Sequence, residues 1–182
     1  MTEIVRETRE TRVKVALERG TGEANVDTGI PFLDHMVRTF IRYAKLQGSV
    51  EARGDLRHHT IEDVAIVCGL AVAELSASNR RRYGDRTIPM DDALVQVCID
   101  NGGRPYYEGP LPSALYDHWM RSFADNAKAT IHIRVLRGTD RHHIVEAAFK
   151  ALGYAIRESL ESDGSTVNST KGEAQIRSGH AD

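Results

Sequence analysis

The feature that most constrains this chain is an internal repeat. The stretch DHMVRTF at residues 34–40 matches DHWMRSF at 117–123, with Asp, His, Arg and Phe at the same offsets and 83 residues apart. The stretch RHHTIED at 57–63 matches RHHIVEA at 141–147 at an offset of 84. One registration covers both motifs with a slip of a single residue. A repeat on this scale predicts a fold built from two similar halves.

The segments around the motifs indicate the same order of elements in both halves. TRVKVAL and ALVQVCID alternate apolar and polar residues as half-buried strands do, and GSVEARGD and ATIHIRVLRGTD do so before each histidine pair. After each pair, apolar residues recur at helical spacing. They are Ile61, Val64, Ala65, Cys68, Ala71 and Leu75, then Val145, Ala148, Phe149, Leu152, Ile156 and Leu160. This pattern predicts a duplicated α+β fold, with helices packed between or against two sheets.

The repeat also sets the expected domain organisation. We expect a single domain over residues 1–172, made of two pseudo-repeats at about 1–88 and 89–172, with the polar stretch 80–92 as their junction. Residues 173–182 follow a Ser- and Gly-rich segment without periodicity, so we expect a flexible tail there.

Composition and charge exclude several classes of protein. The chain has 24 Lys and Arg against 26 Asp and Glu, a balance of −2 that offers no field for nucleic acid or an acidic membrane. Its N-terminus is charged and no apolar run approaches the ~20 residues of a membrane helix, which predicts a cytoplasmic protein. Cys68 and Cys98 lie in apolar runs, and we expect both to be reduced core residues.

Six of the eight histidines fall at repeat-equivalent positions, and this separates them from ordinary histidines. They are His35, His118 and the pairs His58–His59 and His142–His143, whereas His132 and His180 have no counterpart. On a helix, either histidine of a pair can share a face with the glutamate that follows, Glu62 or Glu146. Neighbouring residues point about 100° apart, so each pair is expected to divide its imidazoles between two metal ions.

An alternative for the first pair is a helix start, with Thr60 as N-cap and Asp63 completing a capping box. The second copy has Ile144 in place of Thr60 and would be capped by Thr139 or Asp140 instead. Capping therefore does not explain why the histidine pair and the glutamate recur together. Six histidines and two glutamates make two sites of three His and one carboxylate, a set that suits manganese, iron or zinc.

Several basic residues indicate that a phosphate is bound as well. Arg82, Arg104 and Lys150 have suggestive neighbours, and Ser169 and Lys171 in NSTKG can offer a hydroxyl, an ammonium and backbone N–H groups to an anion. Taken alone, these residues predict a metal-dependent enzyme that acts on a phosphate ester, with the reaction left open.

The motifs GIPFLDHM, HHTIEDVA, GRPYY, DHWMRSFADN, DRHHIVEAAFKALG and STKG, in that order, resemble those of the imidazoleglycerol-phosphate dehydratases of histidine biosynthesis. The resemblance covers residues 10–172. It implies helices sandwiched between two four-stranded mixed sheets, a fold of the ribosomal protein S5 domain 2-like class. It also implies a homo-oligomer, a 24-mer built from trimers, with two manganese(II) ions per subunit at subunit contacts. Other divalent transition metals are alternatives, and no organic cofactor is expected.

The resemblance implies a role for each candidate residue. The metal ligands would be His35, His58, His59, Glu62, His118, His142, His143 and Glu146. The phosphate would meet Arg82, Arg104, Ser169 and Lys171, with Lys150 nearby, and Glu10 would be the catalytic acid and base. The implied reaction is dehydration of D-erythro-imidazole glycerol phosphate to imidazole acetol phosphate, through a metal-bound imidazolate and a diazafulvene-like intermediate. The rival functions are a metal-dependent hydrolase of a phosphorylated small molecule and a non-catalytic metal-binding shell.

One segment departs from the family pattern. The approach to the first histidine pair, GDLRHHT, is about three residues short and carries Arg57 where the family has acidic residues. A carboxylate that would orient a ligand histidine from behind is then missing, or is replaced by Asp55.

Overall fold

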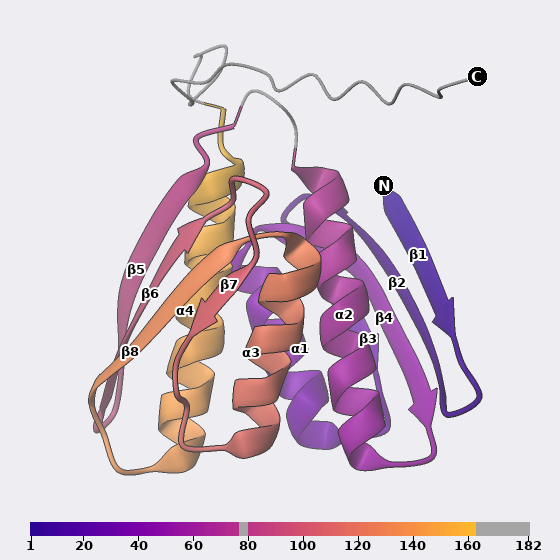
Figure 1. The fold of residues 1–182 in the computed structure, drawn as a ribbon, viewed down its shortest axis with the longest axis horizontal. Coiled ribbons are helices and arrows are strands. Elements are labelled where there is room, and N and C mark those ends of the chain that lie inside the picture. Colours follow the sequence, from indigo (N-terminus) through magenta and orange to yellow (C-terminus); the bar gives the residue numbers. More distant parts are fainter. Residues whose placement is uncertain (77–79, 163–182) are drawn as a thin grey trace, which may run out of the picture.

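The chain folds into two sheets with four helices between them (Figure 1). The computed structural model describes residues 1–76 and 80–162. The first half comprises β1 (Thr2–Glu7), β2 (Thr11–Arg19), β3 (Ala24–Asp27), α1 (Pro31–Tyr43), β4 (Leu46–Gly54) and α2 (Arg57–Leu75). The second comprises β5 (Tyr83–Met90), β6 (Ala93–Asp100), β7 (Tyr106–Glu108), α3 (Ala114–Ala127), β8 (Thr130–Arg137) and α4 (Arg141–Leu160).

The two sheets have the same topology. Their strand orders are β1-β2-β4-β3 and β5-β6-β8-β7, with the first two pairings antiparallel and the last parallel in each. The duplicated α+β fold with helices between two four-stranded mixed sheets is therefore confirmed. The second sheet begins with β5, so the second half takes in the chain from Tyr83 onward.

A single core joins the halves, because helices of both halves meet in the middle layer. Phe40 of α1, Trp119 and Phe123 of α3 and Phe149 of α4 are all fully buried. The Phe40 and Phe123 ring centroids are 5.4 Å apart, and those of Trp119 and Phe149 are 4.6 Å apart. Aromatic contacts of this kind add about 0.5–1.5 kcal/mol each to the stabilisation from burial. The halves are therefore expected to fold as one unit.

Each long helix packs on the shorter helix of the other half, and a glycine allows the close approach. Gly69 of α2 faces the end of α3, where an added Cβ would lie 2.6 Å from the Phe123 carbonyl oxygen. Gly153 of α4, 84 residues later, faces the end of α1, where a Cβ would lie 2.7 Å from the Phe40 carbonyl oxygen. The repeat thus extends to the contact that locks the two halves together.

The structure corrects three expectations from the sequence. The stretch 80–92, expected to be the polar junction, contains β5 of the second sheet, whose charged residues reflect its place at the edge of that sheet. Helix α2 begins at Arg57 with Leu56 as N-cap, so Thr60 lies inside the helix and the capping-box alternative is wrong. Cys68 is fully buried, and burial raises the pKa of its thiol to about 12. Cys98 is also a free thiol but is only half-buried, so its core placement is wrong.

Other expectations are confirmed. Asp140 is the N-cap of α4 and accepts hydrogen bonds from the backbone N–H groups of His142 and His143. No helix in the described part of the chain is long and apolar enough to cross a membrane. The expected tail at 173–182, together with Ser169 and Lys171, lies outside the described residues.

The helix contact gives a prediction whose sign is unusual. A Gly→Ala change inside a helix normally stabilises it by up to about 1 kcal/mol. Gly153→Ala should instead lower the free energy of unfolding by about 1–3 kcal/mol, because its methyl group overlaps the backbone of α1. Thermal unfolding of the variant checks this, and Gly69→Ala should behave in the same way. An unchanged or higher midpoint for both would contradict the close packing.

Candidate metal centres

The first turns of α2 and α4 each present a histidine and a glutamate on one helix face. Because both histidine pairs lie inside their helices, His58 and Glu62 are one turn apart, as are His142 and Glu146. The shorter helix of the other half adds one more imidazole to each face. Two groups result, and in each the ligand atoms lie within 4.8 Å of one another. They are His35, His142 and Glu146, and His58, Glu62 and His118.

The group on α4 is centred on the buried carboxylate of Glu146. Nε2 of His35 and Nε2 of His142 each lie 3.1 Å from Glu146 Oε2, while Lys150 Nζ lies 3.0 Å from Oε1. Burial raises the pKa of Glu146, but the hydrogen bonds from Lys150 and His35 outweigh burial and lower it overall. The carboxylate is therefore held in the charged form that a metal ligand needs.

The group on α2 shows the same arrangement without the lysine. Nε2 of His58 lies 3.6 Å from Glu62 Oε2, and Nε2 of His118 lies 3.2 Å from Oε1. The His118 Nε2 atom is buried, yet it has no hydrogen-bond partner among the described residues. A buried imidazole nitrogen that faces a carboxylate without a hydrogen bond fits a lone pair directed at a cation.

Aspartates of the two repeated DH motifs fix the helices that carry His35 and His118. Asp34 Oδ1 accepts hydrogen bonds from the Thr28 backbone N–H at 2.8 Å and from its hydroxyl at 2.5 Å. Asp117 Oδ1 accepts the Leu111 N–H at 2.8 Å and the Tyr107 hydroxyl at 2.6 Å. Both aspartates therefore anchor the loop that precedes a helix, and the histidine that follows each is left to face the metal group.

His59 and His143, the second members of the pairs, lie outside both groups. Nδ1 of His59 lies 2.8 Å from Asp55 Oδ1, and Nδ1 of His143 lies 2.8 Å from Asp92 Oδ1. These hydrogen bonds raise the pKa of each histidine. The two imidazoles of each pair thus have different partners in the described chain, and their division between two metal ions stays a prediction. The expected replacement of the missing family carboxylate by Asp55 is present as a contact.

Glu10 lies beside the histidine that Asp55 holds. Its Oε2 is 3.7 Å from His59 Nδ1, and its side chain is well exposed in the turn before β2. Asp92 was not among the residues that the sequence analysis singled out. The signal for it was available, because Asp92 directly precedes β6 as Glu10 directly precedes β2.

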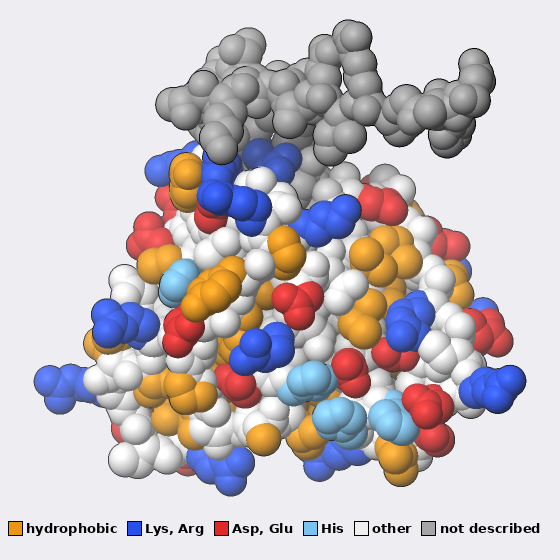
Figure 2. All heavy atoms as spheres, in the orientation of Figure 1, with side chains coloured by type: hydrophobic (Ala, Val, Ile, Leu, Met, Phe, Trp, Pro, Cys, Tyr) orange, Lys and Arg blue, Asp and Glu red, His pale blue; other side chains and the backbone are white. Residues whose placement is uncertain are grey.

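The predicted phosphate residues are divided between two ends of the molecule. Lys150 belongs to the Glu146 group, whereas Arg82 and Arg104 lie around Asp100, at 2.6 Å and 3.7 Å. The Arg82 backbone N–H bonds to the Ser159 carbonyl near the end of α4. Ser159 lies thirteen residues beyond Glu146, which at 1.5 Å per residue is about 20 Å. In Figure 2 a group of histidines lies low on the molecule and several basic side chains lie at the upper end.

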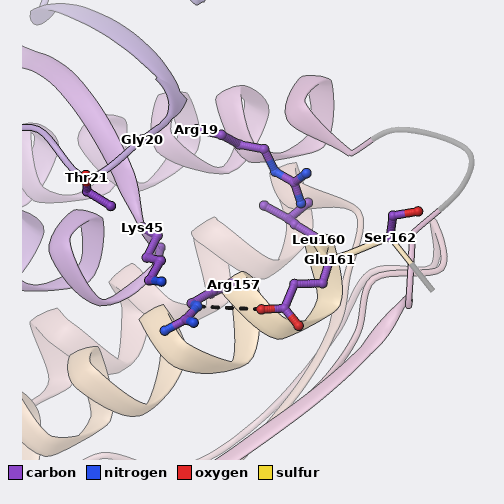
Figure 3. A pocket seen from close by; sticks show the side chains of 9 residues that line it. Arg19, Gly20, Thr21, Lys45, Arg157, Leu160, Glu161 and Ser162 are labelled. Atoms are coloured by element: carbon purple, nitrogen blue, oxygen red, sulfur yellow. Dashed lines mark ion pairs between the residues drawn. The ribbon is translucent and has the colours of Figure 1, made fainter. Parts of the chain in front are cut away.

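A basic cavity of about 530 Å³ also lies at the far end of α4 (Figure 3). Arg19, Lys45 and Arg157 line it, and Arg157 forms an ion pair with Glu161 at 3.6 Å. Its lining, among the described residues, includes no imidazole and no part of either metal group. This cavity is therefore separate from the candidate metal centres.

The fold and the two groups together define a class of protein: an internally duplicated α+β chain with a pair of His/Glu centres suited to divalent transition metals. Imidazole and carboxylate donors without sulfur fit manganese, iron or zinc at a catalytic site better than a structural zinc.

Comparison with known proteins identifies the family. The sequence profile of imidazoleglycerol-phosphate dehydratase matches residues 28–156. The dehydratase of Pyrobaculum calidifontis is 50% identical over 183 residues, which cover 92% of this chain and 96% of the relative. That of Methanococcoides burtonii is 43% identical over 185 residues, covering 93% and 96%. A crystal structure of the Pyrococcus furiosus enzyme superposes with a TM-score of 0.83 at 36% identity, covering 93% of this chain and 99% of that one. The chain belongs to the imidazoleglycerol-phosphate dehydratase family, the hydro-lyases of histidine biosynthesis.

Proposed function

We propose that this chain removes water from D-erythro-imidazole glycerol phosphate to give imidazole acetol phosphate, and that it does so in the cytoplasm with manganese(II) as its metal. The observation that carries the proposal is the pair of equivalent centres, His35–His142–Glu146 and His58–Glu62–His118, in a chain of this family. Two ions per chain follow from two centres.

The chemistry explains why such centres suit this substrate. The proton to be removed sits on carbon and is weakly acidic, and hydroxide is a poor leaving group. A bound metal ion supplies Lewis acidity to the substrate imidazole. The carboxylates of Glu62 and Glu146 and the imidazoles around them would hold that ion. Glu10 would take the carbon-bound proton and return a proton to the departing hydroxyl, and its exposed carboxylate beside His59 suits this exchange.

The distance between the basic residues Arg82 and Arg104 and the metal groups supports an active site shared between subunits. A three-carbon chain with an imidazole at one end and a phosphate at the other spans no more than about 10 Å, given covalent bonds of about 1.5 Å. Arg82 contacts α4 at Ser159, which lies about 20 Å from Glu146 along the helix, about twice the length of the substrate. The phosphate would therefore meet Arg82, Arg104, Ser169 and Lys171 from one chain while the imidazole meets a metal held by another.

The histidines outside the two groups support the same assembly. Each group supplies three protein ligands, and the expected count is three His and one carboxylate. His59 and His143 would each complete a centre whose other ligands come from a neighbouring chain. Metal ions would then link subunits, consistent with the homo-oligomer, a 24-mer built from trimers, that the family resemblance implies. Lys150 would hold Glu146 in its charged form and face the incoming phosphorylated substrate.

The direct test is turnover by purified, manganese-loaded protein. Imidazole glycerol phosphate should be converted to a ketone with its phosphate still attached, and Glu10→Gln should lower kcat by about 10²–10⁴-fold, the range for loss of a general acid and base. Ketone formation in alkali and free phosphate are both measured. Release of phosphate would favour the hydrolase, and no product with metal bound would favour the metal-binding shell.

The shared site is tested by mixing two inactive variants. Arg104→Ala damages the basic end and His118→Asn damages a metal group. Chains of the two variants are dissociated with a chelator and reassembled together with manganese. Activity should return, because some sites then combine an intact basic end with an intact metal group from another chain. A mixture of His118→Asn and Glu62→Gln is the control and should stay inactive, since both changes affect one group. No recovery in the first mixture would place the whole site within one chain.

A further inference from the structure

The two histidines outside the metal groups are held by carboxylates from different places in the two halves. In the second half, Asp92 Oδ1 lies 2.8 Å from His143 Nδ1. A carboxylate can only accept, so Nδ1 must donate and the neutral imidazole carries its lone pair on Nε2. The Oδ2 atom of Asp92 accepts the Thr139 N–H at 2.7 Å and the Asp140 N–H at 3.1 Å. One side chain thus fixes both the ring and the loop before α4.

In the first half these two tasks are divided. The loop before α2 is held by the backbone of Glu10, whose carbonyl accepts the Asp55 N–H at 3.0 Å. The ring of His59 is held by the Asp55 side chain, again through Nδ1 at 2.8 Å. The Glu10 carboxylate takes part in neither contact and lies 3.7 Å from His59 Nδ1.

Glu10 and Asp92 hold equivalent places in the repeat. Each immediately precedes the second strand of its sheet, β2 or β6, and the two sheets share one topology. A carboxylate in this place can therefore clamp the second histidine of the pair, as Asp92 does. In the first half, Asp55 occupies the clamping position instead, within the shortened loop before His58.

We propose that Asp92 and Asp55 are positioning residues that orient His143 and His59 for metal ligation, and that Asp55, by taking over the clamp in the first half, leaves Glu10 free to transfer protons. This rests on the proposed function. It explains why the equivalent carboxylates of Asp92 and Glu10 have different contacts. Asp92 is bonded to the His143 ring and to the loop before α4, whereas Glu10 is exposed beside the site. Carboxylates behind ligand histidines set ring orientation, and their loss costs about 10–100-fold in metal affinity or activity.

The clamp is tested by manganese affinity, measured in the intact assembly by competition with a chelator. Asp92→Ala should weaken manganese binding by about 10–100-fold. Asp92→Asn should weaken it similarly while keeping an acceptor oxygen for the loop N–H groups, because its amide N–H₂ would face Nδ1 and reverse the tautomer. The matched control is Asp85→Asn, which removes the same charge from an exposed position on β5. If Asp92→Asn, with an unchanged unfolding midpoint, bound manganese as tightly as Asp85→Asn, the clamp would be overturned.

The proposal that Asp55 holds His59 in place of Glu10, so that Glu10 can transfer protons, is tested by a double-mutant cycle. In the wild-type background, Glu10→Gln should leave manganese affinity unchanged and lower kcat alone. In the Asp55→Ala background, Glu10 can move onto His59 Nδ1, so Glu10→Gln should now weaken manganese binding as well, and Asp55→Glu should restore the wild-type pattern. Equal effects of Glu10→Gln on affinity in both backgrounds would overturn this part. The affinity readouts do not need turnover, so a wild-type protein without dehydratase activity would contradict the proposed function and leave the clamp to be judged by affinity.

Discussion

The exchange of helix contacts between the halves is the constraint on which the rest of the structure depends. Each long helix packs on the shorter helix of the other half, with Gly69 and Gly153 allowing backbone contact. That contact sets the distance between the first turn of the long helix and the histidine on its partner. Neither half alone holds a complete group, because His118 reaches Glu62 and His35 reaches Glu146 only across the repeat. The packing of the two halves on each other therefore also forms both His/Glu groups.

Duplication provides two copies of each site, and divergence gives the copies different tasks. Lys150 stands beside Glu146, whereas the equivalent position beside Glu62 is Ile66. Asp92 and Glu10 diverge in the same way around His143 and His59. Under the proposed function, such differences would let two centres built from one motif bind and activate a substrate that is itself asymmetric.

The repeat was sufficient to predict the fold class and the two sheets and to single out the six histidines and two glutamates, because periodicity and motif spacing are local properties. The role of these residues as metal ligands stays a prediction. The edge strands β1 and β5 were missed, since their charged sequences resemble loops when their pairing partners are unknown. The start of α2 was ambiguous because Thr60 can cap a helix or lie within one. The separation of Arg82 from the histidines depends on how distant segments pack, and spacing along the chain does not reveal that. Asp92 could have been found, because it directly precedes β6 as Glu10 directly precedes β2.

Both His/Glu groups, each formed across the repeat, are proposed to bind a metal ion. Anomalous scattering from crystals of the manganese-loaded protein tests this proposal most directly, because it locates each ion independently of activity. Two peaks per chain are expected, one in contact with His58, Glu62 and His118 and the other with His35, His142 and Glu146. A single peak, or peaks bound only by residues of one half of the repeat, would contradict the proposal.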